Sequence, residues 1–216
     1  MSYKYNHFYW KSLTFVSMKD RKLLNIELGR ISPEQYRTQR PSSGIVLVLD
    51  NIRSAHNVGS AFRTADAFGV DKIYLGGICP VPPSPELHKV ALGAEEVVPF
   101  QQVPDVVDLV HRLQEEGYTV IAVEQTVNSV KLDEFRPGGD TVSSEHRPFN
   151  CEEETVSPPG KRYALVFGNE VAGVQQEVVD ACNFALEIPQ KGTKHSLNVS
   201  VSIGVVLWAL VQAVNR

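Results

Sequence analysis

Cysteine is scarce in this chain of 216 residues, which contains only Cys79, Cys151 and Cys182. Their number is odd and no two of them form a C-x-x-C pair, so the sequence indicates neither a disulfide framework nor a zinc site. Unpaired, reduced thiols are typical of the cytosol. We therefore expect a cytoplasmic protein that binds no metal.

The sequence also lacks a hydrophobic run long enough to cross a membrane. The longest run, IGVVLWALVQAV at 203–214, is shorter than the roughly 20 residues that a bilayer span requires. Residues 1–15 contain scattered polar side chains and no apolar centre, which is not the pattern of a signal peptide. We expect no membrane partner.

Two common nucleotide-binding motifs are missing as well. The fingerprint G-x-G-x-x-G does not follow the first apolar run, and the phosphate loop G-x-x-x-x-G-K-[ST] does not occur. These absences argue against a dinucleotide-binding oxidoreductase and against a nucleotide hydrolase.

Charge is distributed unevenly along the chain, whose net charge is −4. Residues 1–43 contain eight Lys and Arg against three acidic residues, a charge of +5, so residues 44–216 carry −9. A basic arm on an acidic body indicates an anionic partner held by the arm. Charge alone is equally compatible with a solvated segment that has no partner.

From residue 44 onward, short apolar runs alternate with amphipathic segments. The runs typical of strands lie at 44–50, 72–77, 96–100, 119–125, 163–169 and 184–189. Helical periodicity lies at 58–68, 104–117 and 174–183. This alternation predicts an α/β fold, a mainly parallel sheet with helices on both faces, in a domain at 44–216.

Three segments depart from that alternation. Residues 1–43 are expected to form a helical arm, and residues 137–162, rich in Gly, Pro and acidic side chains, a mobile insertion. In residues 196–213, Ser and Asn first alternate with apolar residues as in a strand. The continuation is apolar nearly all round, as in a buried helix, so the pattern leaves both structures open.

Three polar patches follow predicted strands, where ligands bind in open α/β sheets. The first contains Asn57 and Arg63, the second is FGNEVAG at 167–173, and the third is IPQKGTKHSLN at 188–198. Each patch alone is also explained by ordinary turns and helix caps. His56 and His195 have no partner at a catalytic or metal-binding spacing, and we interpret both as local hydrogen-bonding residues.

Together and in this order, the patches resemble the SpoU (TrmH-like) class of the SPOUT superfamily, which are RNA 2′-O-ribose methyltransferases of tRNA and rRNA. The resemblance is carried by NVGSAFR, LVFGNEVAGV and IPQKGTKHSLNVSVSIGVVLW, and covers 44–136 and 161–213. It implies a C-terminal trefoil knot, a helix within 196–213, a homodimer, and a bound S-adenosyl-L-methionine. It also makes RNA the expected partner of the basic arm.

The resemblance implies roles for particular residues. Gly168, Ile188 and Leu197 would hold the cofactor, largely through backbone groups. Arg63 would bind an RNA phosphate and orient or polarise the ribose hydroxyl, since an arginine is too weak a base to remove the proton alone. Asn57 would fix Arg63 and its loop.

Three further residues complete the predicted site. Glu170 would anchor the second patch or Arg63, and Ser196 and Asn198 would hold the ribose or shape the knot. Purely structural hydrogen bonding remains open for Glu170 and Asn198. A non-catalytic RNA-binding protein with the same fold is the alternative function.

Overall fold

The structure of the protein is a computed structural model that describes residues 21–29, 32, 34–36, 42–136, 162–194 and 196–214. The chain divides into two units, Met1–Ser32 and Pro33–Arg216. In the first unit, the described residues form one 3₁₀ helix, η1 (Asn25–Leu28), and an exposed ion pair between Arg21 and Glu27 at 2.7 Å. Most of the predicted helical arm lies outside the described residues.

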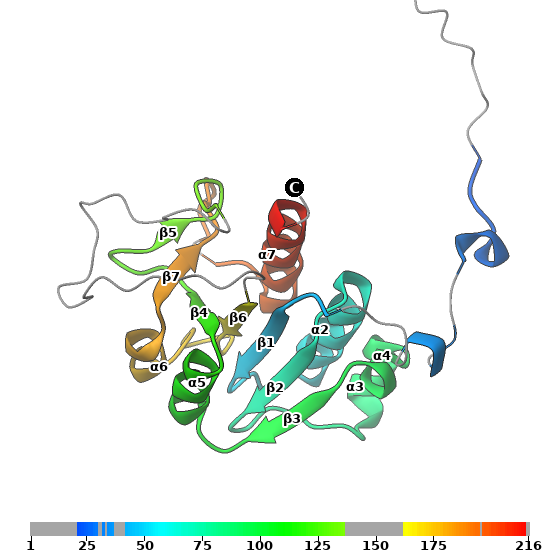
Figure 1. Cartoon of the computed structure of the whole chain (residues 1–216), viewed down its shortest axis with the longest axis horizontal. Helices are drawn as coiled ribbons and strands as arrows, with labels where there is room; N and C mark the ends of the chain where they lie inside the picture. Colours follow the sequence, from blue (N-terminus) through cyan, green and yellow to red (C-terminus); the bar gives the residue numbers. More distant parts are fainter. Residues whose placement is uncertain are drawn as a thin grey trace, which may run out of the picture. The chain divides into compact units, whose positions relative to one another are not determined.

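The second unit contains a seven-stranded sheet in which every strand pair is parallel (Figure 1). The strand order is β3-β2-β1-β6-β4-β7-β5. In chain order the strands are β1 (Ile45–Asp50), β2 (Lys72–Gly76), β3 (Phe100–Val103), β4 (Tyr118–Val123), β5 (Val130–Lys131), β6 (Arg162–Phe167) and β7 (Phe184–Glu187).

Helices cover both faces of this sheet, and each face has its own hydrophobic core. One core contains side chains from α2 (Ala55–Phe68), α3 (Pro85–Ala91), α4 (Ala94–Val97) and α7 (Val199–Val214). The other contains side chains from α5 (Val106–Glu115) and α6 (Gln176–Ala181). Successive residues of a strand face opposite sides, so Leu47 and Leu49 enter the first core and Val46 and Val48 the second. The predicted α/β architecture is confirmed.

Residues 96–100 were predicted to form a strand, and this prediction is wrong. Gly93, in the left-handed conformation, precedes the short helix α4, whose last turn is closed by a bond from Val98 N to Ala94 O at 2.9 Å. Pro99 has no N–H to continue the helix, and β3 begins only at Phe100. The sequence analysis also missed α3 and the two-residue strand β5.

Helix α2 begins three residues earlier than its periodicity predicted. Ser54 caps it, since its side chain accepts a hydrogen bond from Asn57 N at 3.2 Å. The whole first patch from Asn57 to Arg63 is therefore helical. At the other end of the described chain, residues 196–198 are a loop and α7 follows, which confirms the helix that the resemblance implied.

Strand β6 lies between the earlier strands β1 and β4, and α7 packs against α2. The trefoil knot itself stays a prediction. The insertion predicted at 137–162 lies outside the described residues except for Arg162, which begins β6. No helix in the described part of the chain is long and apolar enough to span a membrane.

Candidate functional site

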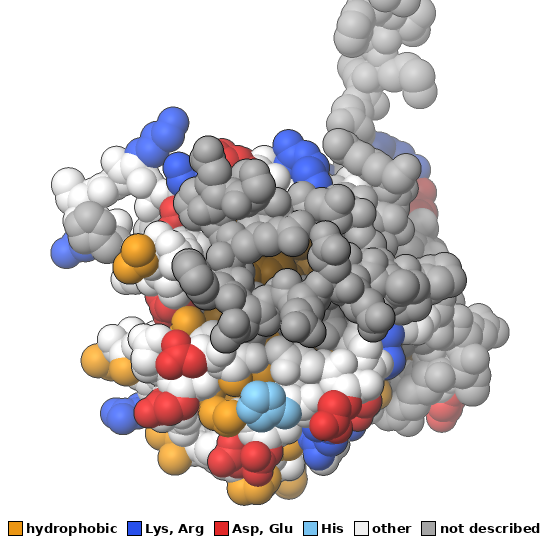
Figure 2. Space-filling model, turned by 60° about the vertical axis from the view of Figure 1, so that its left-hand side comes forward, with side chains coloured by type: hydrophobic (Ala, Val, Ile, Leu, Met, Phe, Trp, Pro, Cys, Tyr) orange, Lys and Arg blue, Asp and Glu red, His pale blue; other side chains and the backbone are white. Residues whose placement is uncertain are grey.

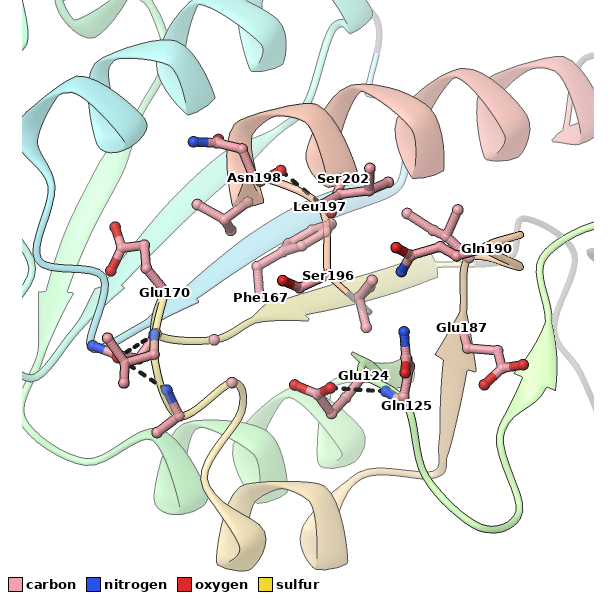
Figure 3. Close-up of a pocket in the computed structure, with 18 of the residues that line it drawn as sticks. Glu124, Gln125, Phe167, Glu170, Glu187, Gln190, Ser196, Leu197, Asn198 and Ser202 are labelled. Atoms are coloured by element: carbon pink, nitrogen blue, oxygen red, sulfur yellow. Dashed lines mark hydrogen bonds between the residues drawn. The ribbon is translucent and has the colours of Figure 1, made fainter. Parts of the chain in front are cut away.

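A pocket of about 510 Å³ opens at the carboxyl ends of β4, β6 and β7, beside the start of α7 (Figure 3). The strands deliver their following loops to one edge because they are parallel. The pocket is lined by the last residues of three strands and the loops that follow them, and by the residues around the start of α7. These are residues 123–125 for β4, 167–173 for β6, 186–188 and 190 for β7, and 196–199 and 202 for α7. The second and third sequence patches therefore meet here.

All three predicted cofactor residues line this pocket: Gly168, Ile188 and Leu197. Leu186 and Phe167 add apolar surface, and Figure 3 shows Leu197 and Phe167 near the centre of the view. An apolar slot bordered by backbone N–H and C=O groups is the usual setting for a flat heterocycle.

The loop after β6 turns back on itself within six residues. Asn169 and Gly173 exchange two backbone hydrogen bonds of 2.9 Å. A side chain at Gly168 would overlap the backbone of Gly173 and Val174, so position 168 admits only glycine without a shift of the loop. This fold-back forms one wall of the pocket.

Side chains at the ends of β1 and β4 hold this loop in place. Asn169 Nδ2 donates to Asn51 O at 2.7 Å, and the carboxylate of Asp50 accepts from Gln175 N at 3.2 Å. Glu124 accepts from Val174 N at 3.0 Å. Asp50 is fully buried, and this burial raises its pKa even though its hydrogen bonds oppose the shift.

Sequence reasoning missed Asp50, Asn51 and the pocket residues Glu124, Gln125 and Glu187. A signal was present, because these polar residues stand at the end of an apolar run that forms a strand, or directly after it. The sequence did not show that these strand ends meet. Strands β1, β6 and β4 are far apart in the chain and become neighbours only in the folded sheet.

Glu170 connects the pocket wall to helix α2. Its carboxylate accepts hydrogen bonds from Asn57 Nδ2 at 2.9 Å, Arg53 N at 3.2 Å and Ser54 N at 3.3 Å. Burial raises the pKa of Glu170, but these hydrogen bonds outweigh it and hold the pKa below that of an ordinary glutamate. The carboxylate thus anchors the second patch to the first, one of the two roles expected for it.

We expect Glu170→Gln to lower the free energy of unfolding by about 1 kcal/mol at pH 7, because an amide cannot accept all three bonds at the start of α2. Because the pKa of Glu170 is lower in the folded than in the unfolded protein, its ionised carboxylate contributes fully to stability above the unfolded pKa of about 4.3. This contribution is lost as the pH falls through the folded-state pKa. Denaturant unfolding at pH 7 and pH 3 measures this. A difference between wild type and variant that is as large at pH 3 would contradict the assignment.

Arg63 is exposed on α2 and does not line the pocket. Within the described residues it forms no hydrogen bond or ion pair, so the expected contacts with Asn57 and Glu170 are absent. Asn57 bonds to Glu170 instead. The physical reason is the geometry of the helix. Asn57 and Arg63 are six residues apart, which separates them by about 9 Å along the axis of α2 and places them on different sides of it.

Asn198 and Ser196 both line the pocket. Asn198 also caps α7, since its Oδ1 accepts from Ser200 N at 2.8 Å and from Ser200 Oγ at 2.5 Å. This is the structural role that the sequence left open. His56 is exposed and forms no hydrogen bond with a described residue, contrary to our interpretation, and His195 lies outside the described part.

Cys79 and Cys182 are free thiols, and Cys151 lies outside the described residues. Burial raises the pKa of Cys79 to about 11 and that of Cys182 to about 12, so neither is a nucleophile at neutral pH. Over the described ranges, one group of side chains (His88, Glu95 and Glu96) is close enough to share a metal ion, and it does not line the pocket.

The fold and the pocket define an α/β protein of the parallel-sheet class, with a pocket built from the ends of three strands, the loops after them and the start of α7. Residues 44–208 match the SpoU rRNA Methylase family, and the chain belongs to that family.

Known relatives and solved structures agree with this membership. The chain is 29% identical over 170 residues to the 23S rRNA (guanosine-2′-O-)-methyltransferase RlmB of Coxiella burnetii, covering 79% of this chain and 59% of that protein. An AdoMet-bound rRNA methyltransferase from Sinorhizobium meliloti is 26% identical, with a TM-score of 0.65 over 85% of this chain and 61% of the other. A TrmH/SpoU tRNA modifying enzyme from A. aeolicus, 23% identical, shares the fold with a TM-score of 0.67, over 85% and 82% of the two chains. The chain spans 54–66% of the length of the curated relatives.

Proposed function

We propose that this protein is an S-adenosyl-L-methionine-dependent methyltransferase that modifies the 2′-hydroxyl of a ribose in RNA. One observation carries the proposal: Gly168, Ile188 and Leu197, to which the family resemblance of the sequence assigns the cofactor, line a single pocket. Membership of the SpoU family and the 2′-O-methyltransferase named among the relatives support the reaction type.

The residues of the pocket fit this cofactor. Leu186, Ile188, Leu197 and Phe167 provide apolar surface for the adenine, and a volume of about 510 Å³ suits a nucleoside with a short amino-acid tail. When bound, S-adenosyl-L-methionine would supply a methyl group to the ribose oxygen: the bond from methyl to the positively charged sulfur breaks with its electron pair returning to sulfur, and the hydroxyl proton passes to solvent.

The chain's own residues orient the RNA toward this pocket. Arg63, free of described partners and exposed, is available to bind a phosphate bidentately and to orient or polarise the ribose hydroxyl. Glu170 and Asn57 hold α2 against the pocket wall, and Asn198 and Ser196 border the pocket from the start of α7. Positioning of this kind contributes up to about 7–11 kcal/mol to a reaction barrier.

RNA contacts are supported by four exposed cations. Arg53 and Arg63 are exposed on or beside α2, and Lys191 and Lys194 are exposed in the loop that contains pocket residues Gln190 and Ser196. Figure 2 shows one face of the molecule, on which basic and acidic side chains of the described residues are interspersed.

We assign the basic arm at 1–43 to contact with the RNA backbone, and we place the protein in the cytoplasm. Relatives named as an rRNA methyltransferase and as a putative tRNA/rRNA methyltransferase support RNA of one of these kinds as the substrate. If deletion of residues 1–43 leaves RNA affinity and its salt dependence unchanged, the arm has no such role.

Incubation with labelled S-adenosyl-L-methionine and total cellular RNA, followed by digestion to nucleosides, tests the function. We expect label in a 2′-O-methylated nucleoside. RNA binding without incorporation of label would favour the non-catalytic alternative, and the nucleoside recovered would identify the modified base.

We further propose that the protein is a homodimer joined through α7. The exposed side of this helix and the loop before it present an apolar stripe: Leu197, Val201, Val205 and Trp208, which are 41%, 49%, 37% and 59% exposed. Val201, Val205 and Trp208 lie on one side of the helix because they are spaced four and three residues apart, and Leu197 lies in the loop just before it. An exposed apolar stripe of this kind is unusual for a surface facing only water.

We expect Val205→Glu to convert the dimer into a folded monomer, since a charge in an apolar interface remains unpaired. Light scattering with size-exclusion chromatography measures the mass, and thermal unfolding checks the fold. Gln102→Glu adds the same charge at an exposed position of β3 and is expected to remain dimeric. A wild-type monomer at micromolar concentration would overturn the dimer.

A further inference from the structure

The pocket is lined by three carboxylates, Glu124, Glu170 and Glu187 (Figure 3), and by no Lys, Arg or His among the described residues. In Figure 3, Glu170 and Glu187 lie on opposite sides of the pocket, with Glu124 between them in the lower part of the view. A negatively charged lining is unusual for a protein whose proposed RNA substrate is an anion. It favours a cationic ligand in the pocket.

Each of these carboxylates accepts hydrogen bonds only from neutral groups. Glu124 accepts from the backbone N–H of Val174 at 3.0 Å and of Gln125 at 2.8 Å. Glu187 accepts from Ser129 Oγ at 2.9 Å. Neither forms an ion pair with a described residue, although Lys131 is the register partner of Glu187 on the adjacent strand β5. No described Lys, Arg or His joins them in the pocket lining, so both carboxylates face the pocket without a paired cation.

Glu170 differs from the other two. It accepts its three bonds at the start of α2, where the positive end of the helix dipole offsets much of its charge. The uncompensated charge of the pocket therefore belongs chiefly to Glu124 and Glu187, which come from the ends of adjacent strands β4 and β7.

We propose that Glu124 and Glu187 make this pocket selective for the cationic methyl donor over the neutral product, S-adenosylhomocysteine. The inference rests on the proposed function. The two ligands differ by one methyl group and by the positive charge on sulfur, so a shape-complementary pocket alone separates them weakly. A pocket with uncompensated carboxylates attracts the donor and releases the product.

The size of the effect follows from the dimensions of the pocket. A round cavity of 510 Å³ has a radius of about 5 Å, which puts wall charges about 6–8 Å from a ligand charge. With an effective dielectric constant of about 40, one such charge changes affinity by about fivefold to tenfold. This selectivity strengthens binding of the donor before reaction and does not accelerate the methyl transfer, since the positive charge disappears as the methyl group leaves.

Calorimetric titration with three ligands tests the proposal: S-adenosyl-L-methionine, S-adenosylhomocysteine and sinefungin, in which a protonated amine replaces the charged sulfonium. We expect the wild type to bind both cations at least about 25-fold more tightly than the neutral product, because the fold-changes from the two carboxylates multiply. In Glu187→Gln the preference falls about fivefold while affinity for the product stays constant, because Gln can still pair with Ser129. Glu124→Gln is also expected to reduce the ratio of donor affinity to product affinity. In the wild type, 1 M salt is expected to reduce this ratio too, because it screens the charges.

Glu115→Gln is the matched control, because it removes one exposed acid at the end of α5, just before the opposite end of β4. Its ratio is expected to equal that of the wild type. If Glu124 or Glu187 has a purely structural role, its substitution would weaken the binding of all three ligands alike and leave the ratio of donor to product affinity unchanged. That result would overturn the proposal. So would a wild type that binds the product as tightly as the donor. A wild type that binds none of the three would overturn the proposed function itself.

Discussion

Arg63→Ala is expected to reduce methyl transfer by about 10²–10³-fold or more, the usual cost of removing a group that stabilises or orients the reacting atoms. Its guanidinium is exposed and has no hydrogen bond or ion pair with the described residues, so no native contact is lost with it. The free energy of unfolding should stay within about 0.5 kcal/mol of the wild type.

Transfer of labelled methyl to RNA measures this loss, and calorimetry with S-adenosyl-L-methionine shows whether the pocket is intact. Cofactor affinity should be unchanged, because Arg63 does not line the pocket. Arg63→Lys should recover only a small part of the activity, since an ammonium cannot reproduce bidentate contact with a phosphate. The control is Arg112→Ala, which removes an exposed arginine from α5 on the other face of the sheet. Near-normal turnover by Arg63→Ala would refute the catalytic assignment.

Gly168→Ala is expected to destroy cofactor binding and to lower the free energy of unfolding by about 1–3 kcal/mol or more. The added methyl group would overlap the backbone of Gly173 and Val174, and backbone cannot rotate away as a side chain can. Relief of the overlap requires opening the fold-back between Asn169 and Gly173, which forms one wall of the pocket.

Gly192→Ala is the matched control. It lies in the loop between pocket residues Gln190 and Ser196, and a Cβ there has no atom within 4 Å. Denaturant unfolding and calorimetric titration should therefore find Gly192→Ala close to the wild type in both stability and cofactor affinity. Wild-type affinity in Gly168→Ala would show that the fold-back is not needed for the pocket.

Much of the site was recognisable from local sequence. Gly168, Ile188 and Leu197 were assigned to one ligand on the strength of three motifs, and they do line one pocket. The role of Glu170 was predicted only as one of two possibilities. Its contact with the start of α2 spans more than 110 positions of the chain, from Glu170 to Asn57, and no local pattern records such a pairing.

Other predictions failed where local patterns were ambiguous. Residues 96–100 have β-branched side chains typical of a strand, yet α4 forms because Gly93 and Pro99 delimit one turn of helix there. Gly59 lies within the motif NVGSAFR, one of the three on which the family resemblance rests. It is buried where α2 crosses α3, since a Cβ at this position would lie 2.6 Å from Leu87 O.

The sequence by itself determined the class of fold, because alternating apolar runs and amphipathic segments can bury their surfaces only as a parallel sheet between two layers of helices. It also determined which loops carry glycine and polar residues. Only the tertiary structure decided the neighbours: β6 between β1 and β4, Glu170 at the start of α2, and Glu124 and Glu187 on the wall of one pocket. Periodicity is a property of a few adjacent residues, whereas the order of strands depends on how the whole chain packs.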